Sequence, residues 1–173
     1  RSLMQAHAPF WQVTGEALDY ALAAHGIDDK GLHDDLMQLY LHLAAYPDAV
    51  SCLKALKQNG FTTGILSNGS PDMLSAAVTS AGLDSHLDHV LSIEDVGIYK
   101  PDPKVYQLAV DQTAVSDASQ ICFVSANTWD AQAAKSFGFQ VARINRFGLP
   151  DDHIPGRPDM LLESLEELPA AVS

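Results

Sequence analysis

The sequence predicts an α/β protein with a doubly wound parallel sheet, and three observations carry this prediction. Short apolar runs of strand length alternate with amphipathic helical patterns from residue 46 to the C-terminus. Small polar residues and a helix-capping signal follow some of these runs, as is typical of strand-to-helix turns. Residues 1–45 contain only helical patterns, so we divide the chain into a helical domain at 1–45 and a core at 46–173.

The helical domain is expected to hold two helices. Apolar residues recur at helical spacing over residues 10–22, and Gly26 ends this pattern. A second apolar stripe covers residues 32–43. The core then begins at Tyr46-Pro47-Asp48, where Asp48 is expected to cap the next helix.

Strands and helices alternate in the core. The strands that this pattern predicts cover residues 61–66, 89–93, 121–124 and 140–144. Gly60, Gly82 and Gly138 end helices that precede or separate them, and Pro103 begins the helix between the second and third strands. Such alternation is typical of a parallel sheet with helices on both faces.

The C-terminal stretch has a different character. Residues 147–159 hold three prolines and predict an irregular loop. Ser164 and Glu167 form a capping box for a last short helix, so the strand at 140–144 is the last one that the sequence predicts.

Length and composition restrict the class of protein. A chain of 173 residues with 47% hydrophobic content can bury one sizeable core. The net charge of −12 argues against nucleic acid or an anionic membrane as a partner. Cys52 and Cys122 show neither zinc spacing nor a disulfide framework and predict small buried side chains. No signal peptide or membrane-spanning run is visible, so we expect a cytoplasmic location.

The most informative segment covers residues 65–71. Its apolar strand stops at Ser67, Asn68 and a glycine follow, and Ser70-Pro71 suits an N-cap and the first helical position. The free N–H groups and the positive dipole end of such a helix bind anions. Taken alone, the segment also fits an ordinary loop between a strand and a helix.

A second segment places Lys100 directly before a helix start. Pro101 stiffens its backbone, Asp102 is expected to cap the helix, and Pro103 suits the first helical position. The usual interpretation is a solvated lysine. A lysine between a tyrosine and this proline-rich turn has less conformational freedom than most surface lysines.

The third segment follows the predicted strand at 121–124 with Ser125, Asn127 and Asp130. Ligands of doubly wound sheets bind outside the carboxyl ends of the strands. Ser67 and these three residues would all lie at that edge, and Lys100 would reach them.

With these three segments together, the chain resembles the haloacid dehalogenase superfamily, and within it the L-2-haloacid dehalogenases. The motifs SNGSP, YKPDPxVY and FVSxNxWDxxxA carry the resemblance, which covers nearly the whole chain. It implies a Rossmann-like core with a helical cap, in a homodimer. It also implies hydrolysis of short L-2-haloalkanoic acids to D-2-hydroxy acids through an aspartyl ester, with no metal or cofactor.

The resemblance also implies roles for individual residues. Ser67 and Asn68 contact the substrate carboxylate and the halide side, Lys100 balances the charge of the carboxylates, and Trp129 forms part of an apolar wall. The catalytic residues that it implies are Ser67, Lys100, Tyr106, Ser125, Asn127 and Asp130, and the substrate-binding residues are Asn68 and Trp129.

One feature of the family is absent from these residues. Its nucleophilic aspartate lies on a first, central strand in an Asp-x-x-Gly-Thr motif, and this sequence contains no such motif. Arg1 matches a position within the cap and takes no catalytic role. We therefore expect the C-terminal three-quarters of an enzyme, with a partial cap, a missing central strand and no turnover by the chain alone.

Alternative interpretations remain open from the residues. Phosphohydrolases of the superfamily bind Mg²⁺ with an acidic pair where this chain has Ser125 and Asn127, so a metal-free reaction is favoured over phosphoryl transfer. A non-catalytic carboxylate-binding or assembly fragment is the other alternative. Trp129 and Tyr106 also fit simple packing roles, and Asp130 fits an exposed position in a first helical turn.

Overall fold

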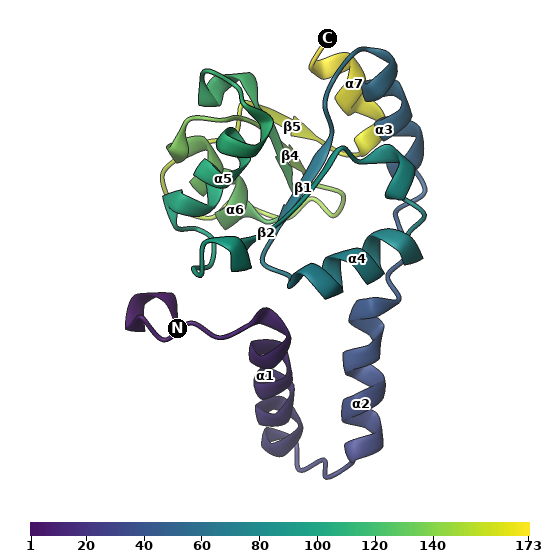
Figure 1. Cartoon of the computed structure of the whole chain (residues 1–173), viewed down its shortest axis with the longest axis vertical. Coiled ribbons are helices and arrows are strands. Elements are labelled where there is room, and N and C mark those ends of the chain that lie inside the picture. Colours follow the sequence, from purple (N-terminus) through teal and green to yellow (C-terminus); the bar gives the residue numbers. More distant parts are fainter.

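A computed structural model describes all 173 residues of the chain. The N-terminal region forms two helices, α1 (Phe10–Ala24) and α2 (Lys30–Gln38), which lie side by side and project away from the core (Figure 1). No strand occurs before residue 64. None of the helices in the structure combines the length and the apolar character that a membrane crossing requires.

The core contains five parallel strands in two separate sheets. These strands are β1 (Gly64–Ser67), β2 (His89–Ser92), β3 (Cys122–Ser125), β4 (Gln140–Ile144) and β5 (Met160–Leu162). β1 pairs only with β2, whereas the other three form a sheet in the order β3-β4-β5. β1, β2, β3 and β5 therefore each have one unpaired edge, and only β4 is paired on both sides.

Five further helices surround the strands. They are α3 (Ala49–Gln58), α4 (Pro71–Ser80), α5 (Pro103–Thr113), α6 (Thr128–Phe137) and α7 (Leu168–Ala171). Short 3₁₀ helices cover Ser2–Met4, Leu39–Leu41, Asp84–His86, Ile93–Asp95, Ala118–Gln120 and Leu165–Glu167. The predicted starts of α4 and α5 are confirmed, because Ser70 accepts a hydrogen bond from the Met73 N–H and Asp102 accepts one from that of Lys104.

The larger hydrophobic core joins α5 and α6 to the β3-β4-β5 sheet. Tyr106 of α5 packs edge-on against Phe123 of β3, with ring centroids 5.8 Å apart, and against Phe139, at 5.9 Å. A second core packs Cys52 of α3 and Leu168 of α7 against Ala142 of β4. Helices thus cover the sheet from two sides, as expected for a doubly wound fold.

Several details of the core differ from the sequence prediction, since β2 ends at Ser92 rather than at residue 93, and β3 covers 122–125 rather than 121–124. Strand β5 was not predicted, because its three residues directly follow the proline-rich loop and are too few to show alternation. The first strand begins at Gly64 rather than at residue 61. The capping box of Ser164 and Glu167 is confirmed, although it caps a 3₁₀ turn. Of the two cysteines, only Cys52 is fully buried, whereas Cys122 is half-buried.

The prediction that Asp48 caps α3 with its side chain is wrong. Asp48 occupies the N-cap position but makes no capping bond. Its carboxylate pairs with Arg146 at 2.7 Å and accepts a hydrogen bond from the Leu165 N–H at 2.9 Å. Both partners lie far along the chain, and the ion pair with the Arg146 guanidinium takes the place of a hydrogen bond to the first turn of α3.

Candidate active site

A buried ion pair between Lys100 and Asp130 forms the centre of the candidate site. The Lys100 Nζ lies 3.1 Å from Asp130 Oδ2, and the two side chains are only 7% and 8% exposed. The same Nζ donates to the Leu66 carbonyl at 2.8 Å. The loop before α5, the first turn of α6 and strand β1 therefore converge on one ammonium group.

Asp130 is fully engaged by its neighbours. The Tyr106 hydroxyl donates to Asp130 Oδ1 at 2.8 Å, and the Ser125 hydroxyl lies 3.3 Å from Oδ2. Asp130 is 6% exposed, so the alternative of a solvent-facing carboxylate in a first helical turn is wrong. Tyr106 fills the core with its ring and also binds this carboxylate, because a buried phenol hydroxyl needs a hydrogen-bond partner.

Burial sets the protonation properties of this cluster. It lowers the pKa of Lys100, and Asp130 opposes this effect by favouring the charged ammonium. The Phe123 ring lies 4.8 Å below the Nζ and adds a cation–π contact. Burial, followed by the Asp130 charge, raises the pKa of Tyr106, so its hydroxyl remains a donor at neutral pH.

Ser67 and Asn68 lie beside this cluster, in the turn between β1 and α4. The Ser67 hydroxyl accepts a hydrogen bond from the Gly69 N–H at 3.1 Å. The Asn68 side-chain oxygen accepts one from the Lys100 backbone N–H at 3.2 Å. Asn68 therefore links the turn after β1 to the loop that carries Lys100.

The remaining two predicted residues are more open to solvent. Asn127 is exposed, and only its backbone N–H contacts the cluster, by donating to the Ser125 hydroxyl at 3.2 Å. Trp129 is 39% exposed, which excludes a purely core role. Both side chains are thus free to meet a ligand.

The position of the cluster in the sheet follows from the strand ends. Ser67 is the last residue of β1 and Ser125 is the last residue of β3. Each of these two strands is an edge strand of its sheet. Lys100 and Asp130 bridge the ends of these two strands, so the predicted residues gather at the carboxyl ends of β1 and β3, where ligands of this fold class bind.

The donor set around Lys100 is mostly neutral. Asp130 is the one carboxylate within it, and no group of three or more His, Cys, Asp or Glu side chains in the structure is placed to hold a metal ion. The cluster contains one cation, one anion and several hydroxyl or amide groups. Such a set suits a small anionic organic ligand better than a hard divalent cation.

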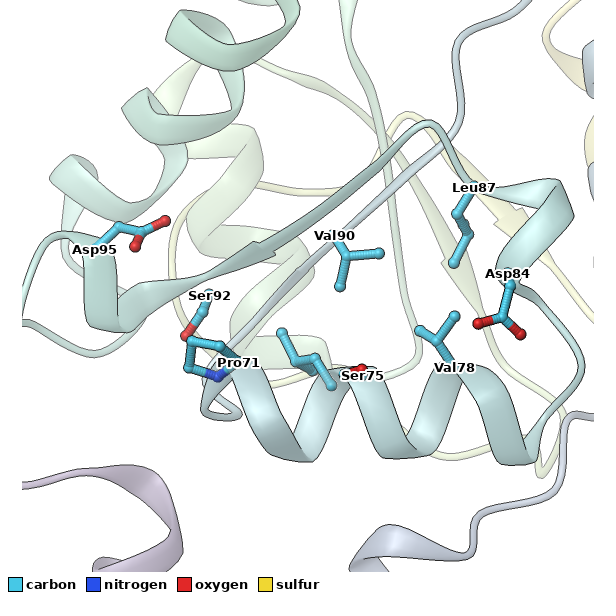
Figure 2. A pocket seen from close by; sticks show the side chains of 9 residues that line it. Pro71, Ser75, Val78, Asp84, Leu87, Val90, Ser92 and Asp95 are labelled. Atoms are coloured by element: carbon cyan, nitrogen blue, oxygen red, sulfur yellow. The ribbon is translucent and has the colours of Figure 1, made fainter.

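A separate hollow lies between α4 and β2 (Figure 2). Its volume is about 460 Å³, and Leu74, Val78 and Val90 give it an apolar floor. The charged residues that line it are Asp84 and Asp95, which would repel an anion. This hollow is therefore not the predicted site.

An apolar cleft of about 630 Å³ separates α1 from α2. Phe10, Val13, Leu36 and Leu39 are among the residues that line it. The Phe10 ring lies 6.1 Å from that of Tyr99, the residue before Lys100. The cleft thus adjoins the loop that carries the buried cation.

Two contributors to the site have little or no signal in the sequence. The Leu66 carbonyl binds Lys100, but backbone acceptors leave no mark in a side-chain pattern. Tyr99 donates from its hydroxyl to the Ala8 carbonyl at 2.5 Å and so links the first residues of the chain to the Lys100 loop. Its position beside Lys100 in the YKPDP segment was the only available signal.

Comparisons with known proteins agree with the predicted resemblance. Residues 3–138 match the family of haloacid dehalogenase-like hydrolases. (S)-2-haloacid dehalogenase 1 of Pseudomonas sp. (strain CBS-3) is 47% identical over 170 residues, which cover 98% of this chain and 74% of that protein. (S)-2-haloacid dehalogenase 4A of Burkholderia cepacia is 47% identical over 97% of this chain and 73% of its own length.

A solved structure supports the same assignment. The L-2-haloacid dehalogenase from Xanthobacter autotrophicus, with chloropropionic acid covalently bound, matches this fold with a TM-score of 0.91 and 36% identity. The match covers 99% of this chain and 79% of that one. Sequence and fold thus agree, and the chain belongs to the family of haloacid dehalogenase-like hydrolases.

Proposed function

We propose that this protein is a hydrolase that acts on carbon–halide bonds and converts short L-2-haloalkanoic acids to D-2-hydroxy acids. The observation that carries the proposal is the buried cluster of Lys100, Asp130, Tyr106 and Ser125 at the strand ends. Proteins that resemble this chain in sequence or in fold are named as haloacid dehalogenases.

The reaction that we propose proceeds in two steps. A carboxylate oxygen bonds to C2 from the side opposite the halogen, and the carbon–halogen bond breaks as its electron pair leaves with the halide. Water then adds to the ester carbonyl and releases the hydroxy acid together with a proton. Attack at C2 inverts that centre, which converts an L substrate to a D product.

Asp130 is not the nucleophile in this proposal. Its two carboxylate oxygens are already bound by Lys100, Tyr106 and Ser125, and the group is buried. We assign the nucleophilic carboxylate to a further strand that occupies the gap between β1 and β3. The unpaired edges of both strands support this assignment, because an unpaired strand edge offers backbone N–H and C=O groups to a further strand.

The other residues of the site would bind and balance charge. Lys100 offsets the charge of Asp130 and of an incoming carboxylate, and Asp130 with its neighbours orients the water of the second step. Ser67 and Asn68 would bind the substrate carboxylate at the start of α4. Trp129 and Asn127, which are exposed, would contact the substrate from the side of α6.

The proposed test restores a complete site and measures both products. The chain would be extended at its N-terminus with the corresponding segment of a relative, with and without an Asp→Asn change in the strand that it adds. We expect chloride and D-lactate from L-2-chloropropionate with the aspartate version, and neither from the asparagine version or from the 173-residue chain. A folded, aspartate-bearing protein that releases no chloride would contradict the proposal.

A phosphohydrolase is the alternative function within the same family. A fold neighbour from Thermococcus onnurineus is named as a phosphatase of the superfamily, at 25% identity and a TM-score of 0.70. The neutral Ser125 and Asn127 favour dehalogenation, because Mg²⁺ prefers anionic oxygens. Phosphate release that depends strictly on Mg²⁺ would support the alternative. Substrate-analogue binding without any turnover would support a non-catalytic carboxylate-binding fragment.

We also propose that the protein self-associates as a homodimer and resides in the cytoplasm. Leu3 is fully exposed and Met4 is 78% exposed, and apolar surface of this kind favours a partner. The two cysteines are free, as is usual for a reducing compartment. Sedimentation at micromolar concentration should show a dimer, and a monomer alone would contradict the first of these proposals.

A further inference from the structure

Arg143 is a buried cation that has no role in the proposed reaction. It lies in β4, directly beside Ser125 of β3 in the strand register, and is 1% exposed. Its guanidinium pairs with Asp151 and donates to the carbonyls of Leu149 at 3.0 Å and Pro150 at 3.4 Å. Arg143 thus holds a run of three consecutive loop residues after its own strand.

The same loop is bound to α6. Asp152 accepts a hydrogen bond from the Thr128 hydroxyl through its carboxylate, and its backbone carbonyl accepts one from Gln132 Nε2 at 2.9 Å. Thr128 is the first residue of α6, and Trp129 and Asp130 follow it directly. The loop therefore connects the Arg143 guanidinium to the helical turn that carries two predicted site residues.

Farther along, the loop packs tightly against α6. At Gly156, where φ is +97°, an added Cβ would lie 2.0 Å from the Gln132 carbonyl oxygen. Only glycine permits both this backbone conformation and this close approach. The loop from Leu149 to Gly156 is thus held at one end by Arg143 and along its length by the helix.

The first turn of α6 depends on this contact because it has no local cap. Asn127 occupies the N-cap position without a side-chain hydrogen bond. The turn is instead held on one side by the bonds of Asp130 and on the other by the bond between Thr128 and Asp152. Loss of either set would leave the turn free to shift.

We propose that Arg143 is a positioning residue that acts through the loop on the first turn of α6 and so sets the places of Trp129 and Asp130. The role of those two residues in turnover rests on the proposed function. The contacts that join Arg143 to α6 through the loop do not depend on it. The competing view is that Arg143 only anchors a surface loop, with no effect on the helix.

The two tryptophans of the chain provide a direct test. In a ¹⁵N spectrum, Trp11 and Trp129 give two indole N–H signals, and Trp11 in α1 serves as an internal reference. Asp151→Ala removes the ion pair at the exposed end of the link, where the Asp151 side chain is 50% exposed, and Thr128→Val removes the hydrogen bond to Asp152 at the helix. Both variants keep the buried arginine, whose guanidinium still has the carbonyls of Leu149 and Pro150 as acceptors. Asp28→Ala, at an exposed carboxylate between α1 and α2, is the control.

We expect both link variants to shift or broaden the Trp129 signal and to leave the Trp11 signal unchanged. Amide exchange in the first turn of α6 should accelerate by about tenfold in both, and the control should change nothing. A Trp129 signal at the wild-type position in either link variant, with faster exchange confined to the loop, would overturn the proposal.

A kinetic measurement separates this inference from the proposed function. In the halide-releasing form of the enzyme, Asp151→Ala should lower kcat for L-2-chloropropionate by about tenfold, whereas Asp28→Ala should not. An unchanged kcat would overturn the positioning role. Absence of halide release from the wild-type form would instead contradict the proposed function, while the tryptophan signals would still test the link.

Discussion

Lys100 and Asp130 neutralise each other in a site that excludes most water. An ion pair of a solvent-exposed lysine contributes little to the free energy of unfolding, so loss of the partner carboxylate has a small effect. In this pair, however, removal of one member leaves the other as an uncompensated buried charge. The stability of the fold and the charge balance of the site therefore depend on the same contact.

We expect Lys100→Met to abolish halide release in the complete enzyme and to lower the free energy of unfolding by about 3 kcal/mol. Urea unfolding at pH 7 measures the second effect. Lys104→Met, at an exposed position in the next helical turn, is the matched control and should stay within about 0.5 kcal/mol of the wild type. A small effect at Lys100 would mean that the lysine is solvated.

Tyr106→Phe tests the other side of Asp130. The change keeps the ring that packs against Phe123 and Phe139 and removes only the hydroxyl that donates to Asp130. We expect a loss of about 2 kcal/mol in unfolding free energy, because the hydrogen bond is to a charged group. Tyr20→Phe, at a tyrosine that is 78% exposed, provides the comparison and should have no measurable effect.

At the scale of elements, the entry into β1 depends on a carboxylate at the start of β2. Asp88 accepts hydrogen bonds from Lys57 Nζ and from the Thr63 N–H, the latter at 2.9 Å. These contacts link the end of α3 to the start of both strands of the smaller sheet. The Thr63 carbonyl in turn accepts hydrogen bonds from the N–H groups of Asp88 and His89, directly before the strand pairing begins at Gly64.

Asp88 should make stability depend on acid pH. The hydrogen bond from Lys57, followed by that from Thr63, lowers the pKa of Asp88 from 3.8 to about 2. Because the folded-state pKa is depressed, the stabilisation is complete above about pH 4 and is lost as the pH falls toward 2. We expect the urea midpoint to fall in this window, and to fall less in Asp88→Asn. Identical pH profiles would contradict the assignment.

At the scale of the whole molecule, the two sheets remain separate in this chain. β4 is paired on both sides, whereas β1 and β3 each have one free edge. A free edge of this kind can pair with another strand. The partner would be either the strand that we propose to carry the nucleophile or a strand of a second copy of the chain.

Hydrogen exchange tests this division of the sheet. Amides of β4 should exchange at least about tenfold more slowly than those of β1 and β3 that face the gap. In the extended protein that restores the central strand, the amides of β1 and β3 should become as protected as those of β4. Uniformly slow exchange in the 173-residue chain would show that the edges are already covered.

The sequence by itself determined the features that depend on neighbouring residues. Ser70-Pro71 and Asp102-Pro103 start α4 and α5 because capping bonds span only two or three residues. The grouping of Ser67, Lys100, Ser125 and Asp130 was also predictable, since parallel strands place their carboxyl ends at one edge. The resemblance carried by the same segments predicted the family.

Only the tertiary structure decided the partners of side chains that are distant in sequence. Asp48 exchanges a local cap for Arg146, 98 residues away, because burial favours the charged partner. The ion pair between Arg143 and Asp151 and the hydrogen bond between Thr128 and Asp152 form only when β4 and α6 have packed together. Whether Asp130 is an exposed first-turn carboxylate or the centre of a buried cluster depends on the fold, because local sequence is compatible with both.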